Sequence, residues 1–170
     1  MALTKVIGSG LGAIPAISGA NLTGLTDSQM PAGSVLQVVF AETTTQTDTT
    51  SGTYADITGM TAAITPSSSS NKILITFSQN IYNNGASAHG PIKLLRGSTD
   101  LQEFGYTSFD SSADHVSTST LQHLDSPSST SALTYKLQFK RVSSGGTIRA
   151  NYDDSAGDPH SMLTLMEIAG

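Results

Sequence analysis

Along most of the chain, hydrophobic and polar residues alternate in short runs, and this alternation predicts the secondary structure. In the run 133–142, every second residue from Leu133 to Phe139 is apolar and the residues between them are polar. A period of two puts the apolar side chains on one face of a β-strand. Eight further runs have the composition of strands: 34–42, 53–65 (interrupted near Gly59), 71–82, 91–97, 102–109, 116–124, 147–152 and 161–169.

Turn-forming residues separate these runs. The segment 66–70 is a Pro-Ser loop, 83–85 is Asn-Asn-Gly, and 143–146 is Ser-Ser-Gly-Gly. Each favours a turn, and the last one favours a hairpin. No segment has the period of an amphipathic helix. The pattern therefore predicts an all-β fold, a jelly-roll or β-sandwich, over residues 34–170.

Residues 1–33 have a different composition, rich in Gly, Ala and small apolar residues, with prolines at positions 15 and 31. Their apolar residues are spaced irregularly and fit neither a helix period nor a clean strand. We expect an extended N-terminal arm that buries its apolar side chains against other copies of the chain or against another protein. The candidate anchoring residues are Ile14, Ile17, Leu22 and Leu25.

Two of the expected strands, 34–42 and 161–169, are apolar on both faces. In the first, strict alternation places Val35 and Val39 on one face and the other apolar residues opposite them. Such strands need cover on both faces. A loop or the arm of the same chain supplies the second cover, or a neighbouring subunit does, and the presence of an arm favours the subunit. The candidate oligomer-interface residues are Val35, Leu36, Val38, Phe40, Leu163, Leu165 and Met166.

Charge narrows the range of partners. Charged residues make up 12% of the chain, its formal net charge is -5 and its pI is about 5.1. With no Lys/Arg run, we expect neither nucleic acid nor an anionic membrane surface as a partner. No apolar run approaches the ~18 residues of a membrane-spanning helix. The chain has no cysteine, so disulfides are excluded and we expect oligomerisation to supply stability.

No arrangement of residues predicts catalysis. The histidines at positions 89, 115, 123 and 160 lack metal-ligand spacing,. Acidic loops at 109–115 and 152–160 lack the terminal Glu of a calcium loop; their aspartates are typical of turns, with calcium as the alternative. Paired carboxylates fit glycan hydrolysis, but the chain is short for the groove it needs. We predict no enzyme, no catalytic residue, no metal and no cofactor.

Four aromatic residues lie in or next to expected loops, flanked by Asn, Asp and Ser. Exposed rings in such surroundings stack on a sugar while their polar neighbours bond its hydroxyls. The alternative is that these rings cap the ends of the core. The candidate receptor or glycan contacts are Tyr82, Tyr106, Phe109 and Tyr152.

Three stretches together carry a family resemblance: 15–25 (PAISGANLTGL), 30–39 (MPAGSVLQVV) and 64–75 (ITPSSSSNKILI). They resemble fibre-like virion proteins of bacteriophages, notably those of marine bacteria and cyanobacteria, in which a short attachment arm precedes a β-domain. The β-domain is also similar to the trimeric jelly-roll heads of the tumour-necrosis-factor and complement-head class. In those heads the first and last strands are neighbours near the three-fold axis. Unlike a long tail fibre, this chain has no repetitive shaft.

The resemblance implies a virion structural protein on the tail or capsid surface of a phage particle. It implies a short fibre or knob, a homotrimer, whose arm (1–33) binds another virion protein. The β-domain (34–170) is displayed for attachment to a host surface glycan or protein. The alternatives are a capsid decoration protein that stabilises the shell, a small depolymerase or esterase, and a secreted carbohydrate-binding module.

Overall fold

The structure is a computed structural model that describes residues 29–84, 89–106, 115–142, 145–153 and 159–170. These residues form ten β-strands and no α-helix, which confirms the all-β prediction. The strands are β1 (Val35–Thr43), β2 (Thr47–Thr49), β3 (Ala55–Ile64), β4 (Lys72–Asn84), β5 (Pro91–Arg96), β6 (Thr99–Tyr106), β7 (His115–Asp125), β8 (Leu133–Phe139), β9 (Thr147–Ala150) and β10 (Ser161–Ile168).

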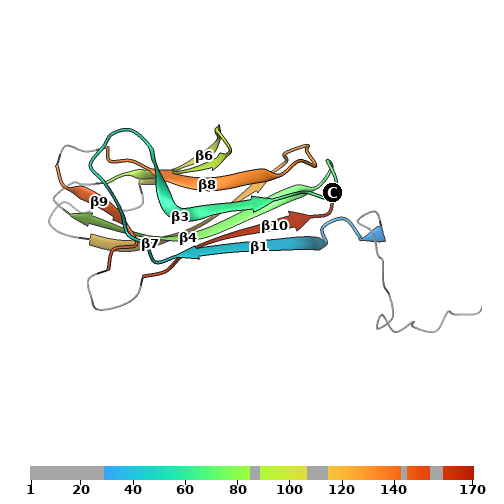
Figure 1. Cartoon of the computed structure of the whole chain (residues 1–170), viewed down its shortest axis with the longest axis horizontal. Helices are drawn as coiled ribbons and strands as arrows, with labels where there is room; N and C mark the ends of the chain where they lie inside the picture. The colour runs from blue at the N-terminus through green and yellow to red at the C-terminus, as the bar shows by residue number, and fades with distance from the viewer. Residues whose placement is uncertain (1–28, 85–88, 107–114, 143–144, 154–158) are drawn as a thin grey trace, which may run out of the picture.

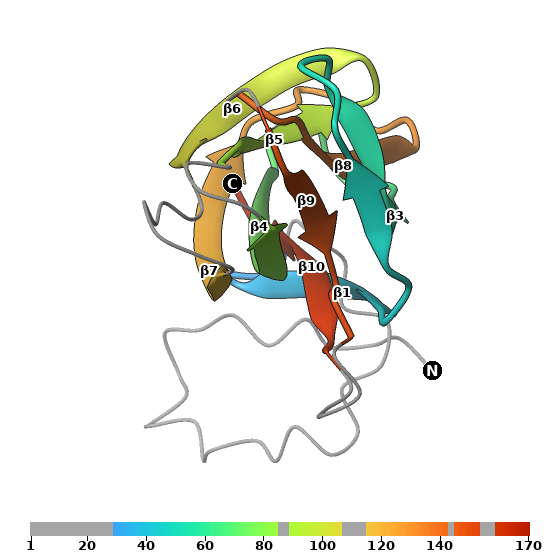
Figure 2. The ribbon, with the colours of Figure 1, turned by 90° about the vertical axis from the view of Figure 1, so that its left-hand side faces the viewer.

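The strands form a two-layer jelly-roll in which every ladder is antiparallel (Figures 1 and 2). One layer is a four-stranded sheet of order β3-β8-β5-β6. The other is a six-stranded sheet in which β1 pairs with β10, β10 with β4, and β4 with β7, while β9 and β2 extend one side of it. The first and last strands, β1 and β10, are therefore neighbours.

The core lies between the two sheets. On β4, Ile73, Ile75, Phe77 and Ile81 are at most 1% exposed, as their alternation predicts. The alternating residues of β8 meet them from the other sheet, since Tyr135, Leu137 and Phe139 are also at most 1% exposed. Aromatic packing links the layers at one edge, where the rings of Phe77 and Phe104 meet edge-on with centroids 5.2 Å apart.

β4 is longer than expected because its partner changes along its length. Residues 72–78 pair with β10, and residues 81–84 pair with β9. Where the partner of β4 changes from β10 to β9, the side-chain amide of buried Gln79 donates to Ser161 Oγ at 2.8 Å. The side-chain amide of Asn151 donates to the Thr45 carbonyl at 3.1 Å. The turn expected at 83–85 was wrong for its first two residues, which continue β4 opposite β9.

Two local features modify the expected strands. Gly59 has a φ of 81°, and the β3–β8 register shifts between Asp56 and Thr61, which confirms the interruption near Gly59. A β-carbon at Gly59 would lie 2.5 Å from Thr43 Cβ, so glycine is also required by space,. The three-residue strand β2 was not predicted.

The chain enters and leaves the domain at the same end, to the right in Figure 1. Gly33 N donates to the Ala169 carbonyl at 2.8 Å, and Ala169 N donates to the Ser34 carbonyl at 2.9 Å. The expected arm, with Ile14, Ile17, Leu22 and Leu25, lies outside the described residues apart from positions 29–33. Its boundary at residue 33 stays a prediction.

Candidate functional site

The outer face of the six-stranded sheet carries a continuous apolar row. Leu74 of β4 lies opposite Met166 of β10 on one side and Leu124 of β7 on the other, and Met166 lies opposite Val38 of β1. These side chains alternate with core residues, so they point away from the four-stranded sheet. With adjacent strands ~4.8 Å apart, the row crosses four strands over roughly 14 Å.

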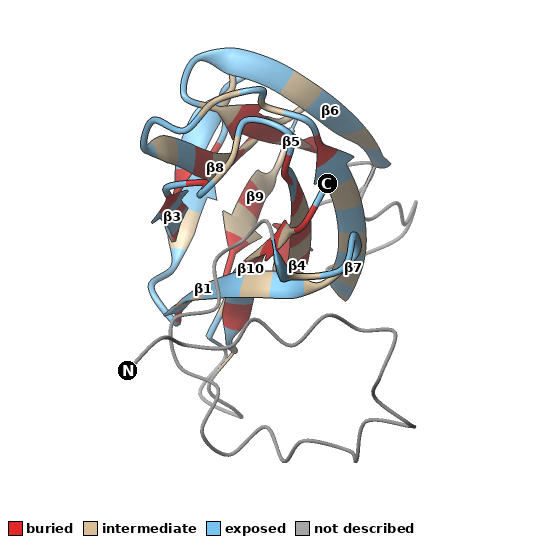
Figure 3. Cartoon of the chain, turned by 90° about the vertical axis from the view of Figure 1, so that its right-hand side faces the viewer, coloured by how far each residue is buried: buried red, intermediate tan, exposed pale blue. Residues whose placement is uncertain are grey.

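Exposed apolar side chains are concentrated on this face. Six of the seven large hydrophobic residues exposed in the described chain lie on it, and only Val142 lies elsewhere. Figure 3 shows β1 and β7 as largely exposed ribbons. The row, with Val35 and Phe40 beside it, is contiguous and indicates an interaction site, whereas Ser, Thr and Gln side chains of β10, β4 and β7 separate Met162 and Val116 from it,. We define the apolar face as Val35, Val38, Phe40, Leu74, Val116, Leu124, Met162 and Met166.

The expected interface residues divide between this face and the core. Val38, Phe40 and Met166 lie on the apolar face, and their part in an interface stays a prediction. Leu163 and Leu165 are 0% exposed and pack in the core, so their assignment to an interface was wrong. Both faces of β10 are apolar, and alternation alone does not tell which one meets the other sheet.

A β-bulge changes the prediction at the start of β1. The register with β10 shifts between Val35 and Gln37, so Leu36 is an extra residue,. Val35 therefore pairs with Ile168 on the outer face, 51% exposed, and does not share the face of Val39 as strict alternation predicts. Half-buried Leu36 lies at the bulge.

Sequence reasoning missed several members of the face. Leu74, Leu124 and Val116 lie at outward positions of β4 and β7, two strands for which the sequence predicted no interface residue. A signal was present: an apolar residue interrupts the polar positions of each strand. It becomes significant only when the register places these interruptions next to one another.

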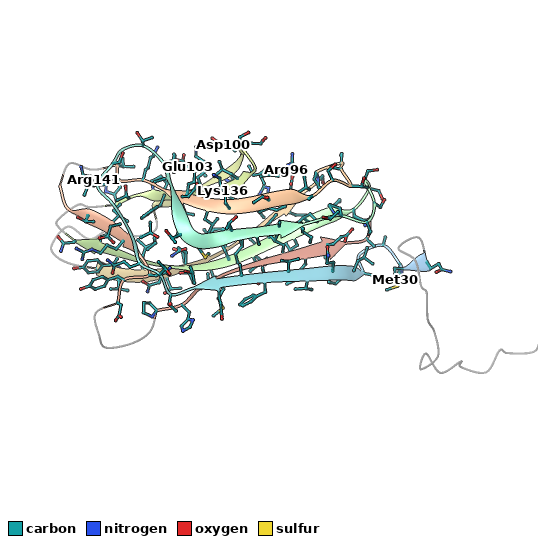
Figure 4. All side chains as sticks on the ribbon, in the orientation of Figure 1. Met30, Arg96, Asp100, Glu103, Lys136 and Arg141 are labelled. Atoms are coloured by element: carbon teal, nitrogen blue, oxygen red, sulfur yellow. The ribbon has the colours of Figure 1, made fainter. Side chains whose placement is uncertain are left out.

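Charge distinguishes the two outer faces of the molecule. On the outward positions of β1, β10, β4 and β7, Glu42 and Lys72 are the charged residues. The four-stranded sheet carries a network instead: Lys136 Nζ lies 2.9 Å from Asp56 and Lys93 Nζ lies 2.7 Å from Asp100. Figure 4 shows Asp100, Glu103 and Lys136 on the side of this sheet. The outer face of the four-stranded sheet is therefore suited to water. On the six-stranded sheet the ion pair Arg149–Asp48 lies over β9 and β2, and the four strands that the apolar row crosses carry little charge.

The pKa of Asp56 reflects this network. Partial burial would raise its pKa, but hydrogen bonds from Lys136 and Gln138, at 2.9 and 2.6 Å, outweigh burial and lower it below its usual range. The carboxylate therefore stays ionised on an exposed surface.

Two buried carboxylates hold the domain together beside the face. Asp125 accepts from the Arg96 guanidinium at 2.5 Å and from the Tyr135 hydroxyl at 2.7 Å, which ties β7 to the other sheet. Burial raises the pKa of Tyr135 above its usual range, and the hydrogen bond to Asp125 adds a smaller effect in the same direction. Glu167 accepts from Ser67 N at 2.6 Å, Ser67 Oγ at 2.7 Å and the Asn71 amide at 2.7 Å, which fixes the loop before β4 to β10.

The candidate glycan contacts are partly accounted for. Tyr82 is 5% exposed and stacks on Tyr152 with ring centroids 3.9 Å apart. The Arg149 guanidinium lies 5.3 and 5.2 Å from the two ring centroids. Tyr82 is therefore not open to a ligand, and its assignment was wrong, whereas half-buried Tyr152 stays a prediction. Phe109 and the side chain of Tyr106 lie outside the described residues.

Among the described residues, no group of three or more His, Asp or Glu side chains is placed to hold a metal ion. The same part of the chain contains no helix long and apolar enough to cross a membrane.

Comparisons with known proteins give no family assignment. No protein-family model matches this chain, and no curated protein sequence matches it. Three solved structures have a weak likeness: T=1 particles derived from infectious bursal virus (12% identity, TM-score 0.42), the VP2 subviral particle of infectious bursal disease virus (11%, 0.42) and the Gx strain of that virus (12%, 0.43). They cover 78%, 78% and 92% of this chain, which spans 36%, 38% and 42% of theirs. Likeness at this level does not establish a shared function.

Proposed function

We propose that the chain is a non-enzymatic structural module of a phage virion that assembles as a homotrimer through the apolar face. The arm of residues 1–33 binds another virion protein. The β-domain projects as a short fibre or knob and contacts a host surface glycan or protein. The proposal combines the sequence resemblance with the contrast between the two outer faces of the jelly-roll.

The apolar row from Val38 to Leu124 is the observation that carries the proposal. An antiparallel sandwich that stays monomeric in water has a polar outer face on each sheet. Here the four-stranded sheet follows that rule, through ion pairs such as Lys136–Asp56, whereas an apolar row interrupts the polar outer face of the six-stranded sheet. A second copy of this chain is an occupant of suitable chemistry, because it brings the same apolar side chains and almost no charge.

The size of the face supports a contribution from the arm. Four strands of about eight residues cover roughly 19 by 26 Å, or about 500 Å². Stable interfaces bury about 800 Å² per partner. The apolar residues at 14, 17, 22 and 25 would add the remaining area by wrapping a neighbouring copy or the virion. Gly33 comes just before the first residue of β1, so the arm joins the domain at one border of the face.

The mass of the purified full chain in solution tests this proposal. Light scattering at micromolar concentration should give three copies, or a multiple of three. Val38→Asp should reduce the mass while the far-ultraviolet spectrum keeps its β-signal, because the variant buries an unpaired charge at the contact. Ala63→Asp, an exposed site on β3 of the other sheet, is the matched control and should leave the mass unchanged. A monomeric wild type, or a Val38→Asp variant with the wild-type mass, would contradict the proposal.

A capsid decoration protein is the second candidate, and it uses the same surfaces. It differs in where the arm binds, so labelling of intact virions separates tail from shell.

A further inference from the structure

The edge strands of the two sheets differ in how well they are protected. An unpaired edge presents free backbone N–H and C=O groups, and natural proteins block such edges with bulges, charges, proline or short length. The ladders of β1, β3 and β6 each contain a register shift. β2 has only three residues.

β7 is the exception. All eleven of its residues, His115–Asp125, pair with β4 without a register shift, and among the described residues β4 is its only partner strand. Its sequence, HVSTSTLQHLD, contains no Lys, Arg, Pro or Gly. Its one carboxylate, on Asp125, is held by Arg96 and the Tyr135 hydroxyl. The second edge of β7 therefore has no partner strand in the described part of the chain, and it is long, regular and without the usual protection.

We infer that two copies of the chain pair through β7, antiparallel, about a two-fold axis at Thr120. The sequence is complementary to itself in this register. Val116 lies opposite Leu124 of the second copy, so apolar side chains meet on the outer face. Thr118 lies opposite Gln122. On the inner side, His115 lies opposite Asp125 of the second copy, a neutral pair because the Asp125 carboxylate is already held by Arg96 and Tyr135. All eleven residues are paired, and each cross-strand neighbour is favourable or neutral.

Exposure supports this occupant. Val116 and Leu124 are 49% and 52% exposed in the single chain. β7 exposes no other large hydrophobic residue, and the two-fold register places each of these two opposite the other. A different extended strand would need its own apolar residues at the same spacing, whereas a second copy provides them by symmetry.

The contact is separate from the proposed trimer. The paired chains run in opposite directions, so their arms leave at opposite ends. Copies within one trimer have their arms at the same end of the three-fold axis. The β7 contact therefore joins a copy in one oligomer to a copy in another, and it doubles the assembly or links it into an array.

Single cysteines test both the contact and its register, because the chain has no native cysteine. In Thr120→Cys the two thiols face each other across the axis, where paired Cα atoms are ~4.5–5.5 Å apart and a disulfide is allowed. In Thr118→Cys the two copies of the same residue are four positions out of register, about 13 Å apart, which is too far. Both residues are exposed on the same strand, so they are matched in accessibility.

After mild oxidation of the full chain, Thr120→Cys should run mainly as a covalent dimer on a non-reducing gel, and Thr118→Cys should stay a single chain. A mixture of Thr118→Cys and Gln122→Cys should cross-link, because these positions face each other. Absence of the Thr120→Cys dimer, or equal cross-linking of Thr118→Cys alone, would overturn the inference. Repeating the experiment in the Val38→Asp background separates the two proposals: a dimer that persists there supports the β7 contact whatever the fate of the trimer, and one that disappears there overturns it.

Discussion

The strongest test of the structure compares Leu165 and Val38, which lie on neighbouring strands. Both belong to strands that are apolar on both faces, but one side chain is buried and the other is exposed. Leu165 is 0% exposed, and Val38 is 58% exposed. Replacing Leu165 by Ala removes three carbon groups at ~0.8 kcal/mol each and leaves a cavity, so we expect a loss of about 2–5 kcal/mol in the free energy of unfolding. Replacing Val38 by Ala removes two groups that are less than half buried, which corresponds to ~0.7 kcal/mol.

Thermal and urea unfolding measure this contrast. For a domain of this size each kcal/mol lowers Tm by roughly 2–4 °C, so Leu165→Ala should lose about 5–15 °C and Val38→Ala about 3 °C or less. Unfolding should be repeated at tenfold higher protein concentration. The Leu165 effect should not change, whereas the Val38 effect should grow, because Val38→Ala weakens the proposed association, which would stabilise the folded chain by mass action. Equal losses in the two variants, or a Leu165→Ala loss below 1 kcal/mol, would refute the placement of these strands.

Two further predictions concern the buried carboxylates. The pKa of Tyr135 is raised, so the folded state keeps a proton that the unfolded state loses above pH ~10, and stability should fall as the pH rises beyond that value. Tyr135→Phe should lose about 1–2 kcal/mol of unfolding free energy at pH 7, because the bond to Asp125 is missing. In urea unfolding between pH 9 and 11, the unfolding free energy of Tyr135→Phe should decline less steeply with pH than that of Tyr152→Phe. An identical slope would contradict the raised pKa of Tyr135. Glu167→Gln weakens three charge-assisted bonds and should lower the free energy of unfolding by about 1.5–3 kcal/mol. The control Glu42→Gln, at an exposed position of β1, should lower it by less than 0.5 kcal/mol. Equal losses would show that Glu167 does not fix the loop before β4.

The sequence predicted the strands well because a half-buried strand must alternate. The strictly alternating residues from Leu133 to Phe139 form β8, with the same first and last residues. The bulge at Leu36 was not predicted, because apolar residues lie on both faces of this strand and hide the change of phase that one inserted residue causes,. Asn83 and Asn84 are favourable in turns, yet the ladder with β9 keeps them in β4,.

The candidate site was predicted in part, for a related reason. The two-sided strands indicated that a second face needs cover, and the structure places Val38, Phe40 and Met166 on the outer face of the six-stranded sheet; their role in an interface stays a prediction. For β10 the two faces are equally apolar, so the choice between Leu165 and Met166 depends on contacts between strands far apart in the chain. The sequence of a single strand contains no information about those contacts.

The pairing of β1 with β10 has a consequence for the order in which the molecule forms. Val38 and Met166 lie opposite each other, although almost the whole domain separates them in sequence. During synthesis β1 therefore has no partner until the last strand has left the ribosome, and closing this contact is slow because it is non-local. The apolar face, built from both strands, therefore exists only after β10 has been synthesised and has paired with β1. In the proposed assembly, a nascent chain without β10 lacks the surface needed to join its neighbours.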